Sequence, residues 1–210
     1  MNKIKSDIIR YAKMLNSKKL SALRSGNISI RYKEGFFITP SGKKYSSLKN
    51  SDIVFVNLDG KFNKKKGIPS SEWKFHQDIY LNKTDANAIV HAHSTNATAV
   101  SAHKRGLPAF HYMIAMAGGN DIKCAKYATF GTRTLSKNIL IALKNRKACL
   151  ISNHGQIAFE ENISKAFELA EEVENISLQY ITTLKLGKPK ILSFKEMKKV
   201  LSKAKNYKKG

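Results

Sequence analysis

Cysteine is scarce in this sequence of 210 residues: it occurs only as Cys124 and Cys149, and neither belongs to a CxxC pair. The sequence therefore has no disulfide framework and no zinc or redox site built from paired thiols. Long hydrophobic runs are also missing, since no window approaches the roughly eighteen uncharged apolar residues of a membrane helix. The first residues scatter charges among apolar positions and contain no secretory hydrophobic segment. We therefore predict a cytoplasmic protein that makes no use of a membrane and keeps its thiols reduced.

Acidic residues are few as well, because 15 Asp and Glu stand against 38 Lys and Arg, which gives a formal net charge of +23. Such an excess is typical of proteins that bind nucleic acid or anionic membranes. However, 32 of the basic residues are lysines and only six are arginines, the residue that bidentate phosphate and base contacts favour. The lysines also spread from Lys3 to Lys209. We interpret them as solvated surface charge, with nucleic-acid binding as an outside alternative.

Glycine- or proline-rich linkers and internal repeats are absent, so we predict a single domain over 1–210 with a basic, flexible tail at about 202–210. Apolar residues at helical spacing predict helices at 4–20, 72–82, 94–104, 134–145 and 163–186. Alternating or continuous apolar runs predict strands at 27–31, 35–39, 53–56, 88–93, 109–115, 148–151 and 156–159. Helices and strands interleave irregularly, and several strands are neighbours in sequence. This order favours an α/β fold with a central mixed, mostly antiparallel sheet covered by helices.

Three histidines occupy positions typical of metal ligands. His91 and His93 are two residues apart on a predicted strand, so both side chains point to one face, with Cα atoms about 6.5–7 Å apart. His154 lies in an Asn-His-Gly turn, and Glu72 opens a predicted helix with a carboxylate. Three imidazoles and one carboxylate suit zinc, although the His-x-His pair is also compatible with two half-buried strand residues. We interpret His76 as a histidine of the helix surface, with a supporting role behind Glu72 as the alternative.

Three short turns rich in hydroxyl groups predict an anion site. They are residues 25–27 (SGN), 39–42 (TPSG) and 69–71 (PSS). Ser70 and Ser71 precede a predicted helix N-terminus, where N–H groups and the helix dipole favour a phosphate. No P-loop or GxGxxG pattern occurs, so a nucleotide is not expected. Each turn alone is compatible with ordinary capping, but together with a metal site they predict a small phosphorylated metabolite as the ligand.

Six sequence segments carry a resemblance to a known family. They are PSSEWKFH at 69–76, DANAIVHAH at 85–93, HYMIAMAGGN at 111–120, YATFGTR at 127–133, ALKNRKA at 142–148 and HG at 154–155. With these segments the chain resembles the class II aldolase/adducin family, from the first helix to about residue 200. The resemblance implies a zinc-dependent aldolase that reversibly cleaves L-fuculose 1-phosphate, or a similar ketose 1-phosphate, to dihydroxyacetone phosphate and L-lactaldehyde. It also implies a homotetramer with active sites between neighbouring subunits.

The same resemblance implies a role for each candidate site residue. One zinc ion per subunit is held by Glu72, His91, His93 and His154. The substrate phosphate is bound by Gly26, Asn27, Ser41, Gly42, Ser70 and Ser71. Glu72 moves the proton at the enediolate carbon, and Tyr112 handles the hydroxyl proton of the fragment that leaves as an aldehyde. Contacts from the neighbouring subunit are made by Tyr112, Phe130 and Tyr207.

Two features depart from the family pattern. Ala92 stands between the paired histidines, where the aldolases usually carry an amide, and the C-terminal residues 204–210 are shorter and more basic than usual. Other members catalyse different reactions, so an L-ribulose-5-phosphate 4-epimerase, or another sugar-phosphate lyase or dehydratase, is the alternative. The epimerases tend to carry Asp at the position of Glu72, which favours the aldolase. A non-catalytic, adducin-like binding module is the outside alternative, and four converging ligands argue against it.

Overall fold

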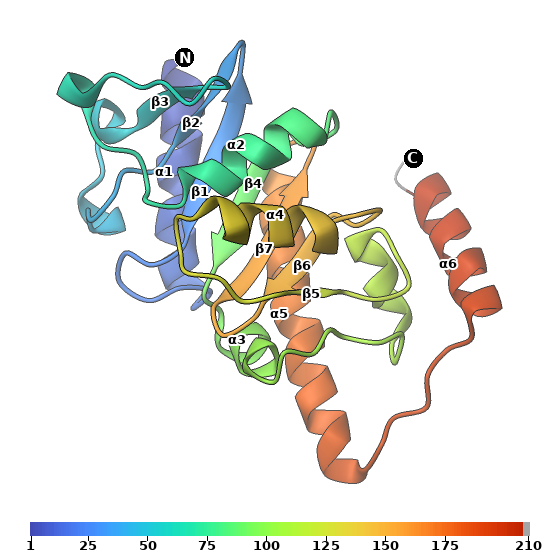
Figure 1. Ribbon diagram of the computed structural model, residues 1–210. Helices are drawn as coiled ribbons and strands as arrows, with labels where there is room; N and C mark the ends of the chain where they lie inside the picture. The colour runs from blue at the N-terminus through green and yellow to red at the C-terminus, as the bar shows by residue number, and fades with distance from the viewer. Residues whose placement is uncertain (208–210) are drawn as a thin grey trace.

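A seven-stranded sheet forms the centre of the protein (Figure 1). The computed structural model describes residues 1–207, and for residues 205–207 it describes the backbone only. The strands are β1 (Asn27–Tyr32), β2 (Gly35–Ile38), β3 (Val54–Asn57), β4 (Ala88–Ala92), β5 (Cys124–Ala125), β6 (Ala148–Ile151) and β7 (Gly155–Glu160). Their order is β3-β2-β1-β4-β7-β6-β5, and only the β5–β6 pair is parallel. The predicted mixed, mostly antiparallel sheet is therefore confirmed.

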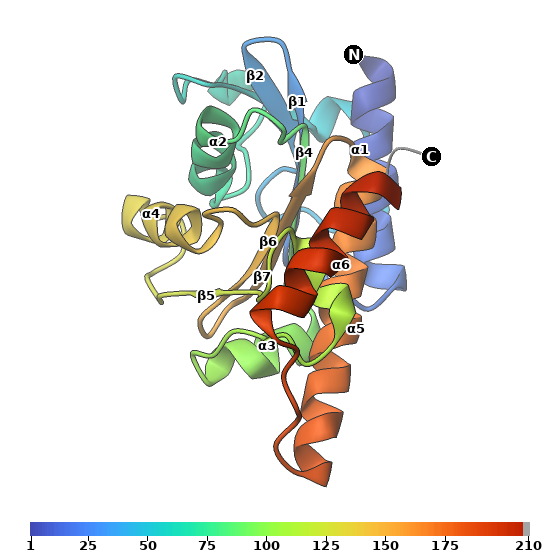
Figure 2. The same cartoon turned by 90° about the vertical axis from the view of Figure 1, so that its right-hand side faces the viewer.

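Helices cover both faces of this sheet, as Figure 2 shows with the sheet almost edge-on. One face carries α2 (Trp73–Asn82) and α4 (Arg133–Ala142). The other face carries α1 (Asn2–Ser17), α3 (Thr95–Ala102), α5 (Ile163–Leu186) and α6 (Phe194–Tyr207). Among the described residues, no helix is long and apolar enough to span a membrane.

The central strands are apolar on both sides because each side has its own core. Along β4, Ile89 packs in the core under α2 and α4, whereas Val90 packs in the core under α1 and α5. Side chains two apart on a strand share a face, so His91 points to the same side as Ile89. The ring of Phe75 on α2 confirms this, since it meets the His91 ring edge to face at 5.4 Å. The histidine of the central strand therefore faces α2.

The prediction of a strand at 109–115 is wrong. The chain forms a 3-10 helix at Tyr112–Ala117, in which Ile114, Ala115 and Ala117 are buried. Ile114 and Ala117 are three apart and therefore share one face of such a helix. A short apolar run does not distinguish a strand from a buried helical turn. Gly118 ends the helix with a left-handed φ of 88°.

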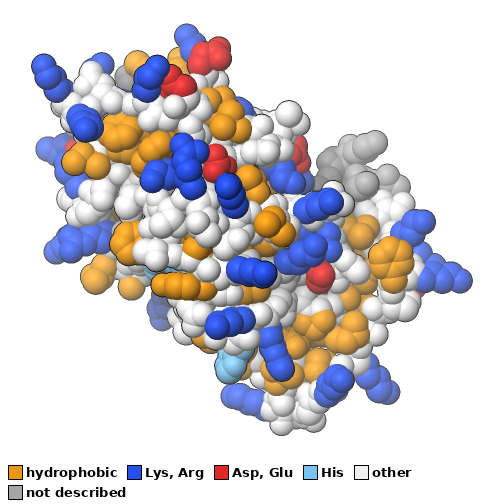
Figure 3. Space-filling view, viewed as in Figure 1, with side chains coloured by type: hydrophobic (Ala, Val, Ile, Leu, Met, Phe, Trp, Pro, Cys, Tyr) orange, Lys and Arg blue, Asp and Glu red, His pale blue; other side chains and the backbone are white. Residues whose placement is uncertain are grey.

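The sequence did not predict α6, which contacts the 3-10 helix and places Met197 in the same core. The expected tail at 202–210 overlaps α6 up to Tyr207, and its last three residues lie outside the described part of the chain. Its flexibility stays a prediction. Lys and Arg side chains are scattered over the face drawn in Figure 3 and do not form one stripe, in keeping with solvated surface charge.

Candidate metal centre and phosphate pocket

Four segments bring the candidate metal ligands together. Glu72 immediately precedes α2, His91 lies on β4, His93 follows that strand, and His154 lies in the turn between β6 and β7. The turn is held close to β4, because a Cβ on Gly155 would stand 2.4 Å from the carbonyl oxygen of Ala92. Glycine at this position therefore lets the β6–β7 turn place the His154 imidazole beside the end of β4.

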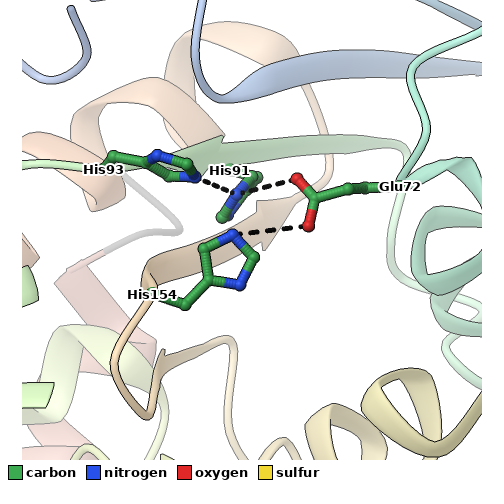
Figure 4. Close-up of side chains that lie close together, drawn as sticks. All are labelled: Glu72, His91, His93 and His154. Atoms are coloured by element: carbon green, nitrogen blue, oxygen red, sulfur yellow. Dashed lines mark hydrogen bonds and ion pairs between the residues drawn. The ribbon is translucent and has the colours of Figure 1, made fainter. Parts of the chain in front are cut away.

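The four side chains point toward one another (Figure 4). His91 Nε2 lies 3.0 Å from His93 Nε2 and 3.2 Å from Glu72 Oε2. His154 Nε2 lies 3.3 Å from Glu72 Oε1. The three imidazole centroids are 4.8 Å from one another, with ring planes inclined by 71–80°. Four ligands at 2.0–2.1 Å from a tetrahedral ion would stand about 3.3 Å apart, so the observed spacing fits a four-coordinate metal.

The electrostatics of the cluster also favour a cation. The Nδ1–H of His91 donates to the Gln156 carbonyl at 2.8 Å, so in the neutral ring the lone pair of Nε2 faces the other ligands. Burial, together with the imidazole of His91, lowers the pKa of His93 to about 3 and that of His154 to about 4. Burial raises the pKa of Glu72, but the opposite effect of the facing imidazoles is larger, and the net result is a pKa lowered to about 2. Glu72 Oε1 is buried and accepts no hydrogen bond from the described residues. A cation would satisfy this convergence of electron pairs.

A cavity of about 360 Å³ opens beside the cluster. Its lining includes Glu72, His93 and His154. It also includes every residue predicted to bind phosphate, namely Gly26, Asn27, Ser41, Gly42, Ser70 and Ser71. The three hydroxyl-rich turns and three of the four candidate metal ligands therefore line one cavity.

Known proteins resemble this chain over most of its length. Residues 6–181 match the family model described as Class II Aldolase and Adducin N-terminal domain. The chain belongs to the class II aldolase and adducin family. L-fuculose phosphate aldolase of Escherichia coli (strain K12) is 49% identical over 207 residues, which cover 98% of this chain and 96% of the relative. A 5-methylthioribulose-1-phosphate/5-deoxyribulose-1-phosphate aldolase of Rhodospirillum rubrum is 43% identical over 97% of this chain and 92% of the relative.

The fold agrees with these relatives. A solved structure of an L-fuculose 1-phosphate aldolase superposes with a TM-score of 0.93 and 38% identity, covering 97% of this chain and 96% of that chain. The family and fold predicted from the sequence are confirmed, and this class II aldolase is an enzyme of the lyase class.

Three residues of this class II aldolase were predicted to contact a neighbouring subunit. Tyr112 is 55% exposed and is not part of the cavity lining within the described residues. Phe130 is 65% exposed and lines the cavity of its own chain, although the resemblance implied a contact with the neighbouring subunit. The side chain of Tyr207 lies outside the described residues. The neighbouring-subunit roles of all three stay predictions.

Sequence reasoning missed Arg24 and misplaced His76. Arg24 lines the cavity and donates to the carbonyl of Gly42 at 3.0 Å. As one of only six arginines, directly before a hydroxyl-rich turn, it carried a signal that could have been read. The surface position proposed for His76 is wrong, because its side chain is 0% exposed and lies with Phe75 and Tyr80 on the buried face of α2.

Proposed function

We propose that this class II aldolase uses zinc to cleave reversibly the C3–C4 bond of a ketose 1-phosphate, releasing dihydroxyacetone phosphate and an aldehyde. The expected substrate is L-fuculose 1-phosphate, with L-lactaldehyde as the aldehyde, because the relative of 49% identity is an L-fuculose phosphate aldolase. One observation carries the proposal: the hydroxyl-rich cavity and the ligand cluster share a wall, where Glu72 directly follows Ser70 and Ser71. A small phosphorylated molecule can therefore reach both parts of the site.

In this proposal the hydroxyl-rich part of the cavity binds the phosphate. Ser70 and Ser71 lie at the N-terminus of α2, whose dipole and N–H groups attract an anion. The guanidinium of Arg24 adds a positive charge at the rim. We assign phosphate binding to Gly26, Asn27, Ser41, Gly42, Ser70 and Ser71.

The ligand cluster supplies the chemistry. Zinc held by Glu72, His91, His93 and His154 would act as a Lewis acid that stabilises the negative charge left on the dihydroxyacetone phosphate fragment. Glu72 is placed to move the proton at the carbon that carries this charge, because its carboxylate both belongs to the ligand cluster and lines the cavity. No lysine occurs among the described residues that line the cavity, so a Schiff base has no candidate there.

The other end of the substrate lies toward the cavity mouth. Tyr127 and Phe130 place exposed aromatic rings there, which suits the apolar end of a deoxy sugar. We propose that the protein is a homotetramer in which Tyr112 reaches the site of a neighbouring subunit and handles the hydroxyl proton of the leaving aldehyde. The exposure of Tyr112 outside its own chain's cavity supports this arrangement. We also propose a cytoplasmic location, which the two free thiols support.

A second substrate has its own support. The relative of 43% identity acts on 5-methylthioribulose 1-phosphate and 5-deoxyribulose 1-phosphate, which carry the phosphate at the same position. Epimerisation of L-ribulose 5-phosphate would use the same ligands. A non-catalytic adducin-like role is disfavoured by the four converging ligands, and nucleic-acid binding by the scattered lysines.

The test is cleavage of L-fuculose 1-phosphate with coupled detection of dihydroxyacetone phosphate, with 5-deoxyribulose 1-phosphate and L-ribulose 5-phosphate assayed in parallel. Wild type, Glu72→Gln and His93→Ala are compared, with bound metal measured for each. We expect wild type to cleave the substrate only when zinc is bound, and we expect both variants to lose this activity. The proposal would be overturned if folded, zinc-loaded wild type cleaved no ketose 1-phosphate. Epimer formation from L-ribulose 5-phosphate would then assign the protein to the epimerase alternative.

A further inference from the structure

Polar side chains form a stripe between α2 and β1, in a place where apolar packing is the rule. Along α2 the stripe runs from Glu72, the residue before the helix, to His76 and Tyr80 within it, each four residues apart and therefore on one face. On β1 it consists of Asn27 and Ser29, two residues apart and also on one face. All five residues are buried.

A continuous chain of hydrogen bonds joins the stripe to the candidate metal centre. Tyr80 Oη lies 2.7 Å from Ser29 Oγ, which lies 2.7 Å from His76 Nδ1. His76 Nε2 lies 2.5 Å from Asn27 Oδ1, and Asn27 Nδ2 donates to Glu72 Oε2 at 3.1 Å. The His76 ring is held in one plane between two aromatic rings, with Phe75 at 4.8 Å and Phe36 at 6.4 Å. This packing keeps both ring nitrogens directed at their partners.

The chemistry of the groups fixes the direction of the chain. An ionised Glu72 only accepts, so Asn27 must donate with Nδ2 and turn its Oδ1 to His76. Because Oδ1 also only accepts, His76 carries its proton on Nε2. In the neutral ring, Nδ1 then accepts from the Ser29 hydroxyl, and Ser29 accepts from Tyr80. While Glu72 is ionised, none of these hydrogen bonds can exchange its donor and acceptor.

We propose that His76, as the Nε2–H tautomer, is a positioning residue that orients Glu72 through Asn27. Its proton decides which end of the Asn27 amide faces the carboxylate. With the amide turned round, Oδ1 would meet Glu72 Oε2, and two acceptors would repel each other. In the observed orientation Asn27 holds Oε2, while Oε1 remains directed at His154 and the ligand cluster. The inference rests on the proposed function only for its catalytic consequence, since the orientation itself is a property of the metal centre.

The test uses two substitutions at His76 and one matched control in the zinc-loaded protein. His76→Leu removes both ring hydrogen bonds, whereas the side-chain amide in His76→Gln keeps one donor and one acceptor. The control is Ser136→Ala, which removes a different hydrogen bond to α2, the partly buried one that Ser136 donates to Asp78. For His76→Leu we expect kcat and zinc affinity each to fall by about 10- to 100-fold, the usual effect of losing a group that orients a metal ligand. We expect His76→Gln to recover most of both losses and Ser136→Ala to change neither.

A spectroscopic measurement reads the chain direction without any substrate. In the ¹⁵N spectrum of histidine-labelled protein, the His76 signals are identified by their loss in His76→Gln. Nε2 should show the protonated shift and Nδ1 the unprotonated shift. The reverse tautomer would overturn the proposal. It would also be overturned if His76→Leu bound zinc as tightly as Ser136→Ala, or if His76→Gln did not recover the zinc affinity that His76→Leu loses. If His76→Leu does not fold, the tautomer still decides. If wild type cleaves no ketose 1-phosphate, the proposed function fails, whereas tautomer and zinc affinity still decide this inference.

Discussion

Asn27 on β1 lies opposite His91 on β4 in the antiparallel register, and both side chains reach the same oxygen of Glu72. Asn27 Nδ2 stands 3.1 Å from Oε2, and His91 Nε2 stands 3.2 Å from it. A slip of one residue between these strands would turn one of the two side chains to the other face of the sheet. The geometry of the metal centre is therefore tied to the β1–β4 register, which the alternating cores on the two faces maintain.

Removal of the metal should abolish activity and lower stability together. Without a cation, the lone pairs of the imidazoles and of Glu72 face one another in a buried place. Zinc that binds only the folded state adds about 2.7 kcal/mol at a free concentration 100 times its Kd. We expect a chelator to lower the Tm of wild type but not of His93→Ala, in thermal unfolding at fixed protein concentration. Full activity in protein shown by elemental analysis to be metal-free would contradict the assignment.

Arg24 should matter for phosphate binding rather than for the bond cleavage. Its guanidinium lies at the cavity rim and donates to the Gly42 carbonyl, so it both charges and shapes that turn. We expect Arg24→Ala to raise KM by about tenfold, equivalent to 1.4 kcal/mol, with kcat little changed. Inhibition by inorganic phosphate should weaken by a similar factor. Lys13→Ala, on an exposed part of α1, is the charge-matched control. Equal KM values in the two variants would remove Arg24 from the phosphate site.

Some elements were predictable because their signals are local. The helix predicted at 163–186 coincides with α5, since Asn162 caps its start, Gly187 follows its end, and apolar residues recur along one face between them. The His91–His93 pair was predictable from strand spacing alone. Glu72 and His154 could be added to that pair only as candidates by residue type, because no local pattern relates residues so far apart in sequence. The family resemblance then implied the full ligand set.

Other features depend on tertiary packing and could not be read locally. His76 has helical spacing to both apolar and polar residues, so the sequence does not reveal that α2 turns it toward β1. In α6, lysines separate Met197 from Val200 and Leu201, and the short apolar stripe was hidden in a basic segment. The 3-10 helix that α6 covers was mistaken for a strand for the related reason that buried turns and strands share apolar composition.

Acid should destabilise the protein partly through His76. Burial, together with the imidazole of His91, lowers the pKa of His76 from 6.5 to about 3. Between these values the unfolded state binds the proton and the folded state does not, so the free energy of unfolding falls as the pH falls. One such proton contributes at most about 1.4 kcal/mol per pH unit. We expect His76→Gln to reduce the slope by about this amount in urea unfolding between about pH 6 and 4. An unchanged slope would mean that His76 is protonated to the same extent in both states.

Met197 should hold α6 against the body of the protein. Its side chain is 1% exposed and packs in the core formed by α1, α5 and the 3-10 helix at Tyr112–Ala117. Truncating a buried methionine usually costs about 2–5 kcal/mol, since both transfer energy and packing are lost. We expect Met197→Ala to lower the free energy of unfolding within this range, measured by urea unfolding at equal protein concentration. Lys198→Ala, at the exposed neighbouring position, should change it by no more than about 0.5 kcal/mol. If the two variants unfold at the same urea concentration, the Met197 side chain contributes no packing energy between α6 and the rest of the protein.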